Sequence, residues 1–139
     1  MTLGRPGITV VLDVNDLERA AEFWSAALGF PKQRPITQFM LLRPEDPEDH
    51  RPHLILQKVP EAKVGKNRAH VDLFFPSRDE ARDRLLGLGA RMVQDQPNCI
   101  GSHCWYLMAD PEGNEFCVVG DQAAAPAAAT PAPEQRPIG

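Results

Sequence analysis

His70 and Asp72 are the two residues whose types and spacing most directly suggest chemistry. They lie two positions apart in a run, His-Val-Asp-Leu-Phe-Phe, whose β-branched and aromatic residues predict a strand. Because side chains alternate along a strand, both residues point to the same face of a sheet. A carboxylate beside a histidine orients the imidazole and raises its basicity, so the pair could act as a general acid/base or bind a ligand. A hydrogen-bonded pair with a purely structural role is the alternative.

Polar residues directly before this run could bind an anion. Lys66, Asn67 and Arg68 precede His70, and the forked guanidinium of Arg68 matches a carboxylate or a phosphate. The alternative is a solvated linker in which Arg68 forms a salt bridge to Asp13 or Asp72.

One residue of an aromatic pair and one aspartate are further candidate ligand contacts. Trp105 and Tyr106 are adjacent in an expected strand and point to opposite faces, so one of them could contact a flat ligand while the other packs in the core; core packing of the pair as a whole is the alternative. Asp13 shares a strand face with Thr9 and is the other candidate; a carboxylate inside a strand needs a partner.

The three cysteines are Cys99, Cys104 and Cys117, an odd number without a C-x-x-C pair. This spacing argues against a disulfide framework and against a structural zinc site, so we expect reduced thiols. A metal cluster of Cys99, His103 and Cys104 is disfavoured because no carboxylate lies near them in sequence.

Composition narrows the class of protein. The chain has 139 residues, 42% hydrophobic and 24% charged, which suits one domain or two small fused modules. The formal net charge of -4 argues against nonspecific nucleic-acid binding. No apolar run has the roughly twenty residues of a membrane helix, and no signal peptide is evident, so we expect a cytoplasmic protein without membrane or nucleic-acid partners.

The chain contains an internal repeat. Residues 9–16 and residues 70–77 each form an apolar run that closes on a helix N-cap, and glycines at 29 and 89 end the two expected helices. Helices are expected over 16–28 and 77–88, and strands over 8–14, 37–42, 53–59, 68–75, 91–94, 104–109 and 115–119. Residues 31–36 form a short edge strand or a connector.

The repeat predicts two modules, each with the order βαβββ. We expect one folded region over residues 8–120, made of a module over 8–60 and a module over 67–120. Residues 1–7 are expected to be a flexible N-terminus, and the Ala/Pro-rich residues 121–139 a disordered tail.

Several motifs resemble one known superfamily. Residues 17–24 read Leu-Glu-Arg-Ala-Ala-Glu-Phe-Trp and are followed by Leu-Gly-Phe at 28–30; residues 109–116 read Ala-Asp-Pro-Glu-Gly-Asn-Glu-Phe. In this order they resemble the vicinal oxygen chelate superfamily, which includes glyoxalase I, extradiol dioxygenases, bleomycin-resistance proteins and fosfomycin-resistance enzymes. With Val-Pro-Glu at 59–61 and residues 66–72, the chain is most similar to the bacterial glyoxalase-like domain branch, and the resemblance spans residues 8–119.

The resemblance implies an α+β fold in which two βαβββ modules form a half-open mixed β-sheet barrel around a ligand cavity, and it implies a homodimer. In metal-using members, four ligands come from positions that correspond here to Thr9, Gln57, His70 and Cys117. The family more usually has His or Gln, Glu, His and Glu there. Threonine is a poor ligand and neutral glutamine a weak one, so the departure argues against conventional metal catalysis.

We therefore expect a metal-independent protein that binds or modifies an organic ligand with a carbonyl, carboxylate or aromatic group, and no cofactor. The catalytic candidates are His70 and Asp72, and the ligand-binding candidates are Thr9, Asp13, Gln57, Arg68, Trp105 and Cys117. The alternative is a divalent-metal-dependent lyase, isomerase or dioxygenase of the glyoxalase type, with the metal at His70, Gln57 and Cys117. A third possibility is a degenerate module kept as a scaffold.

Overall fold

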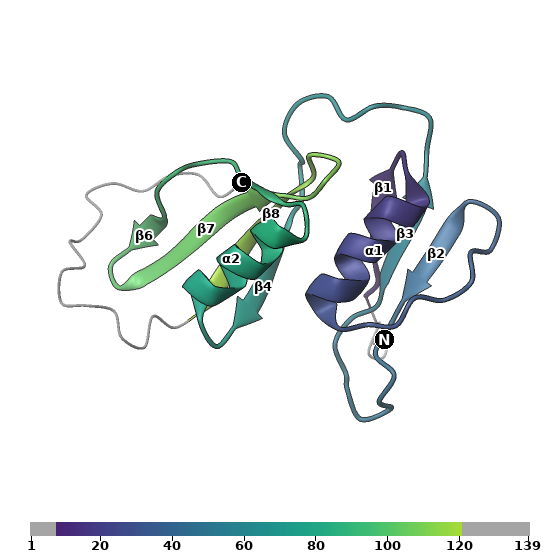
Figure 1. Ribbon diagram of the computed structural model, residues 1–139, viewed down its shortest axis with the longest axis horizontal. Helices are drawn as coiled ribbons and strands as arrows, with labels where there is room; N and C mark the ends of the chain where they lie inside the picture. Colours follow the sequence, from purple (N-terminus) through teal and green to yellow (C-terminus); the bar gives the residue numbers. More distant parts are fainter. Residues whose placement is uncertain (1–7, 121–139) are drawn as a thin grey trace, which may run out of the picture. The chain divides into compact units, whose positions relative to one another are not determined.

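The computed structural model describes residues 8–120, which divide into two compact units with the boundary between Ala62 and Lys63 (Figure 1). Each unit is described by itself. The expectations for residues 1–7 and 121–139 lie outside the described residues. Neither described helix has the length and apolar character that crossing a membrane requires.

The first unit is a three-stranded sheet covered by one helix. Its elements are β1 (Val10–Val14), α1 (Leu17–Leu28), β2 (Phe39–Leu42) and β3 (Leu54–Lys58). The strand order is β1-β3-β2, with β1 parallel and β2 antiparallel to β3. The segment over 31–36 is a connector that carries only isolated bridges, from Lys32 to Leu42 and from Ile36 to Phe39.

Helix α1 begins and ends where the sequence predicts. The Asp16 carboxylate accepts a hydrogen bond from the Arg19 N–H at 3.1 Å, as an N-cap does. Gly29 ends the helix at φ 71°, a left-handed conformation that glycine adopts without steric cost. The buried face of the helix comprises Ala20, Ala21, Phe23 and Trp24.

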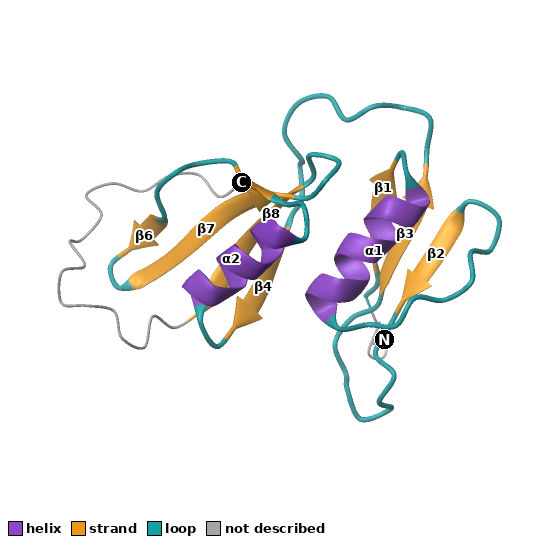
Figure 2. Cartoon of the chain, in the orientation of Figure 1, coloured by secondary structure: helices purple, strands orange, loops and turns teal. Residues whose placement is uncertain are grey.

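The second unit contains β4 (Val71–Phe75), α2 (Arg78–Gly87), β5 (Arg91–Met92), β6 (Asn98–Ile100), β7 (His103–Ala109) and β8 (Glu115–Gly120). The strand order is β4-β8-β7-β5, and β6 also pairs with β7 (Figure 2). Strand β4 is parallel to β8, whereas β7 is antiparallel to β5, β6 and β8. Strand β6 was not among the expected strands.

These elements confirm the α+β fold class. Each unit combines one helix with a mixed sheet, and neither sheet closes on itself, as expected for a half-open arrangement. The first unit has the order βαββ, since residues 31–36 form no strand, and the second has βαβββ with β6 added.

The two faces of the second sheet differ in what covers them. The Tyr106 hydroxyl donates to the Asp79 carboxylate of α2, and Arg82 of α2 donates to the same hydroxyl at 2.8 Å. Tyr106 therefore lies on the face that α2 covers. Because side chains alternate, Trp105 and Leu107 lie on the opposite face, which we call the open face.

A buried arginine joins α2 to two strands. Arg78 is 9% exposed, and its Nη1 donates to the carbonyls of Cys104 at 3.2 Å and Gly120 at 3.5 Å. Gly120 is tightly enclosed, because a Cβ built there would lie 2.3 Å from the Phe75 carbonyl oxygen. The end of β8 is thus fixed against both α2 and β4.

The expectation of three reduced thiols is wrong for Cys99 and Cys104. These residues form a disulfide, and only Cys117 is a free thiol among the described residues. The cause is register: Cys99 and Cys104 are directly opposite each other in the β6–β7 pairing. Cysteine spacing alone does not reveal this geometry, because strand β6 was not anticipated.

Replacing Gly120 with alanine should destabilise the second unit by about 1–3 kcal/mol, because the added methyl group meets backbone atoms that cannot move independently. Gly87→Ala is the matched control, since a Cβ at Gly87 meets nothing within 4 Å in the last turn of α2. We expect that variant to be stabilised by about 0.4–1 kcal/mol. The free energies of unfolding of both variants are measured by urea unfolding, followed by Trp105 fluorescence. Trp24 is changed to phenylalanine in all samples. Equal free energies of unfolding for Gly120→Ala and Gly87→Ala would contradict the tight enclosure of Gly120.

The disulfide predicts a definite thiol count. With a thiol reagent in denaturant and no reductant, one group per chain should react, namely Cys117. After reduction all three cysteines should react. Three reactive thiols in unreduced, freshly purified protein would show that the Cys99–Cys104 bond does not form.

Candidate functional site

His70 and Asp72 lie together, as the strand pattern predicts. His70 directly precedes β4 and Asp72 is its second residue; the His70 Nε2 is 3.4 Å from the Asp72 Oδ1. The side chains are 19% and 42% exposed, so the pair is accessible to a small molecule. Leu73 is buried between the exposed Asp72 and Phe74, which places Asp72 on the face away from α2.

Cys117 completes a cluster with this pair. It lies on β8 directly opposite Asp72 in the parallel β4–β8 pairing and is 1% exposed. One ligand atom each from His70, Asp72 and Cys117 lies within 4.8 Å of the others. The structure therefore brings together both catalytic candidates and one ligand-binding candidate.

Burial decides the protonation state of Cys117. Burial foremost, and then the negative charge of Asp72 and a hydrogen bond to it, raise the pKa of the Cys117 thiol to about 12. At neutral pH the group is a thiol that donates to the Asp72 carboxylate, and it is a weak nucleophile. Of the cluster, His70 is then the residue whose side chain could serve as an acid or base.

An apolar surface adjoins the polar cluster on the open face. Cys117 belongs to a buried group with Trp105, Leu107 and Val119, on neighbouring strands β7 and β8. Of the two adjacent aromatic residues, Trp105 is thus the one on the open face and Tyr106 the one under α2. These side chains are buried, so they form an apolar interior beside the partly exposed His70 and Asp72.

The first-unit candidates lie on one strand pair. Asp13 on β1 is opposite Gln57 on β3, Asp13 is exposed and Gln57 is half-buried. Thr9 is exposed and precedes β1. The four positions of the metal-site expectation thus divide into Thr9 and Gln57 in one unit and His70 and Cys117 in the other, and their joint action stays a prediction.

The segment before β4 is anchored at its start. Glu115 forms an ion pair with Lys63 (Oε1 to Nζ, 3.2 Å) and accepts from the Asn67 N–H at 3.0 Å. Burial opposes ionisation of Glu115, but these two partners outweigh it and lower its pKa. Arg68 is exposed, and no ion pair joins it to Asp72 within the described part of the chain. Its role as an anion contact stays a prediction.

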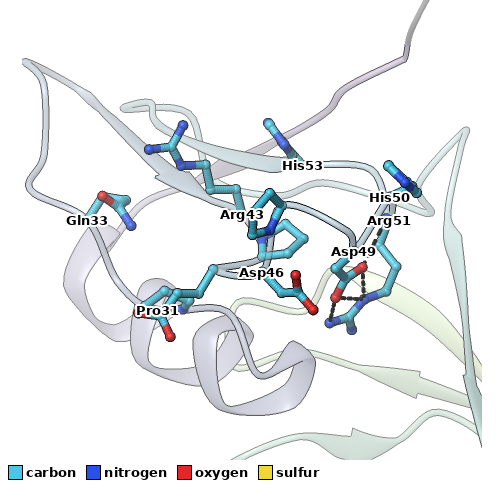
Figure 3. Close-up of a pocket in the computed structure, with 11 residues that line it drawn as sticks. Pro31, Gln33, Arg43, Asp46, Asp49, His50, Arg51 and His53 are labelled. Carbon is cyan, nitrogen blue, oxygen red and sulfur yellow. Dashed lines mark hydrogen bonds and ion pairs between the residues drawn. The ribbon is translucent and has the colours of Figure 1, made fainter.

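The first unit also has a shallow hollow of about 650 Å³ in the loop between β2 and β3 (Figure 3). Two of its charged side chains form hydrogen bonds within the protein. Asp49 binds Arg51 through three side-chain hydrogen bonds, and Arg51 also donates to the Leu28 carbonyl at the end of α1. His50 and His53, at the same hollow, are exposed, as the acidic, proline-rich sequence suggests. We therefore place the candidate site on the second sheet.

Asp72 has a larger part in the cluster than its place in the sequence predicts. It was predicted as the partner of His70, while the third metal ligand was expected to be Gln57. In the structure Asp72 is grouped with His70 and Cys117, because the parallel pairing of β4 with β8 sets it opposite Cys117. The i, i+2 spacing of His70 and Asp72 predicts that they share a strand face. The sequence does not show which strand pairs with theirs.

Comparison with known proteins agrees with the fold. The family model described as "Glyoxalase-like domain" matches residues 9–119. A comparison with curated proteins finds no match. Among solved structures, a glyoxalase/bleomycin resistance protein/dioxygenase from Nocardioides has a TM-score of 0.61 at 21% identity, over 87% of this chain and 88% of that chain.

Two further solved structures are similar. A glyoxalase/bleomycin resistance protein/dioxygenase family enzyme from Burkholderia phytofirmans has a TM-score of 0.65 at 15% identity, covering 81% of this chain and 95% of that chain. The fosfomycin resistance protein FosX from Listeria monocytogenes, solved with Mn(II) and sulfate, has a TM-score of 0.66 at 15% identity, covering 88% and 93%. At these identities the likeness concerns the fold.

Asp72→Asn should lower the pKa of Cys117 from about 12, because the variant loses the carboxylate charge that opposes thiolate formation. The raised pKa also means that the folded state keeps a proton that the unfolded state releases. Wild-type stability should therefore fall as pH rises from the ordinary value of 9.0 toward about 12, and fall less in the variant. Thiolate absorbance against pH, on chelator-treated protein, measures the shift. Asp13→Asn is the control and should leave the pKa of Cys117 unchanged. An unchanged Cys117 pKa in Asp72→Asn would mean that burial alone raises it.

Proposed function

This chain belongs to the glyoxalase-like domain family, and we propose that it binds a small organic molecule over the open face of its second sheet. The observation that carries the proposal is the cluster of His70, Asp72 and Cys117 beside an apolar surface. A ligand with a carbonyl, carboxylate or aromatic group matches this combination. Arg68, in the same unit, would contact an anionic group of the ligand.

If the bound molecule is chemically modified, His70 is the acid or base. Asp72 lies next to the imidazole Nε2, which leaves Nδ1 as the nitrogen free to exchange a proton with a ligand. Asp72 orients the ring. Cys117 stays a neutral thiol and supports Asp72 by donating to it.

A metal-dependent activity is the second candidate, and one observation favours it. The nitrogen, oxygen and sulfur donors of His70, Asp72 and Cys117 are close enough for one ion. Three protein ligands of these types suit zinc with one open position, whereas Mn(II), the ion in the FosX structure, prefers oxygen ligands. When bound, such an ion polarises a ligand carbonyl. The protein groups would then hold the ion, and a bound ligand would lie against the apolar surface.

Two further features are part of the proposal. We expect a homodimer, as the family resemblance implies, and a cytoplasmic location, as the sequence suggests. The Cys99–Cys104 disulfide argues against the cytoplasmic location, because disulfides are uncommon in reducing compartments.

Metal content distinguishes the two candidates. We expect untagged protein, as purified and after incubation with manganese, iron, nickel or zinc, to retain no stoichiometric ion by elemental mass spectrometry. A near-stoichiometric ion that is lost in His70→Ala but kept in His53→Ala would favour the metal-dependent alternative and overturn the metal-independent one.

Ligand binding is tested by thermal shift with benzoate, benzaldehyde and benzamide, with and without chelator. At concentrations well above Kd, a binding probe should raise Tm regardless of chelator. His70→Ala should reduce the shift, because the ligand loses its polar contact, while His53→Ala in the exposed loop should keep it. Circular dichroism checks that both variants are folded. Equal shifts in the two variants would remove His70 from the site.

A further inference from the structure

Two buried polar atoms on the second sheet have no hydrogen-bond partner within residues 8–120. They are the indole Nε1 of Trp105 and the side-chain oxygen Oδ1 of Asn98. Trp105 is 3% exposed and Asn98 is 2% exposed, so water contact at the surface does not satisfy them. A buried donor or acceptor without a partner costs about 1–3 kcal/mol, and native proteins rarely keep one without a reason.

The two atoms belong to directly opposite residues. Asn98 on β6 pairs with Trp105 on β7 in antiparallel register, so both side chains lie on the same face of the sheet. Opposite side chains in such a pair have Cβ atoms about 4.5–5.5 Å apart. One unpaired donor and one unpaired acceptor therefore belong to neighbouring side chains on the same face.

The Asn98 amide forms a hydrogen bond to a neighbouring glutamine. Its Nδ2 donates to Gln94 Oε1 at 2.6 Å, which leaves Oδ1 as the free atom. Rotating the amide would break this bond and place two acceptors together. The free oxygen is thus a consequence of the local hydrogen bonding.

This pair lies on the open face, the face of the candidate site. Trp105 is in the buried group with Cys117, and Cys117 lies opposite Asp72. The third unpaired atom, Nε of Arg78, belongs to a residue of α2 on the other face, and we do not include it. The exposed His103 ring lies 5.6 Å from the Trp105 ring, so the indole is adjacent to solvent at one side.

We propose that Asn98 and Trp105 together bind one ligand group that both accepts and donates a hydrogen bond, a carboxamide or a hydroxyl. The indole N–H donates to the oxygen of this group, and its N–H or O–H donates to the Asn98 oxygen. An ionised carboxylate has no donor and leaves the Asn98 oxygen unsatisfied, so the pair discriminates against it. The inference rests on the proposed function, since it describes a second polar contact for the same bound molecule.

The indole N–H provides a direct test by ¹⁵N–¹H correlation spectroscopy. The chain has two tryptophans, Trp105 and Trp24, so two indole signals are expected, and Trp105→Phe assigns them. Benzamide and benzoate are the probes, matched in ring and size but differing in the donor. Benzamide should move the Trp105 indole signal and leave that of Trp24, which lies in the first unit, unchanged. Benzoate should bind at least about tenfold more weakly.

Two variants check the partners. Asn98→Leu should bring benzamide and benzoate to within about threefold of each other, because the acceptor that separates them is gone. Trp105→Phe keeps a ring but removes the donor, and should weaken benzamide binding about tenfold, as followed by backbone amide shifts. The wild-type comparison of the two probes does not depend on either variant folding.

The outcomes separate this inference from the proposed function. If benzamide shifts the backbone amides of His70, Asp72 and Cys117 but not the Trp105 indole, the proposed function stands and this inference fails, and a buried water then satisfies the two atoms. Equal affinity for benzoate and benzamide in the wild type also overturns the inference. If neither probe shifts either set of signals, both proposals fail for this ligand class.

Discussion

The parallel pairing of β4 with β8 is the interaction on which the second unit depends. It sets Asp72 opposite Cys117, and with them it places His70 at the edge of the apolar surface. It also makes β8 a central strand, between β4 and β7, so that its residues from Phe116 to Val119 are buried. Gly120 and the buried Arg78 hold the end of this strand close to β4 and α2. Cluster, core and helix packing are thus consequences of one strand register.

The sequence predicted what depends on local chemistry. Both helices begin at expected caps. These are Asp16, one of two candidates with Asn15, and Ser77, because a side-chain oxygen there satisfies a free N–H of the first turn. The common face of His70 and Asp72 follows from strand alternation, and the fold class follows from the repeat and the motifs. The caps and the shared strand face are set by residues within a few positions of one another.

What the sequence did not predict depends on pairing between distant segments. Strand β6 is three residues long and lacks alternation, and without it neither the Cys99–Cys104 bond nor the Asn98–Trp105 pair can be inferred. The place of Asp72 among the metal-ligating candidates depends on the β4–β8 register, which no local pattern encodes. In each case the missing information was which residue lies opposite which.

The same pairing has a consequence for the order of events in folding. Between β4 and β8 the chain makes α2, β5, β6 and β7, so the pairing closes a long loop, whereas β7 and β8 are joined by a short turn. Local contacts form faster than those that close long loops, so the β7–β8 hairpin is expected to precede the docking of β4. During synthesis His70 and Asp72 emerge well before Cys117 is translated. The polar cluster therefore forms only when the last strand has joined the sheet, and a nascent chain that has not reached β8 contains His70 and Asp72 but not the complete site.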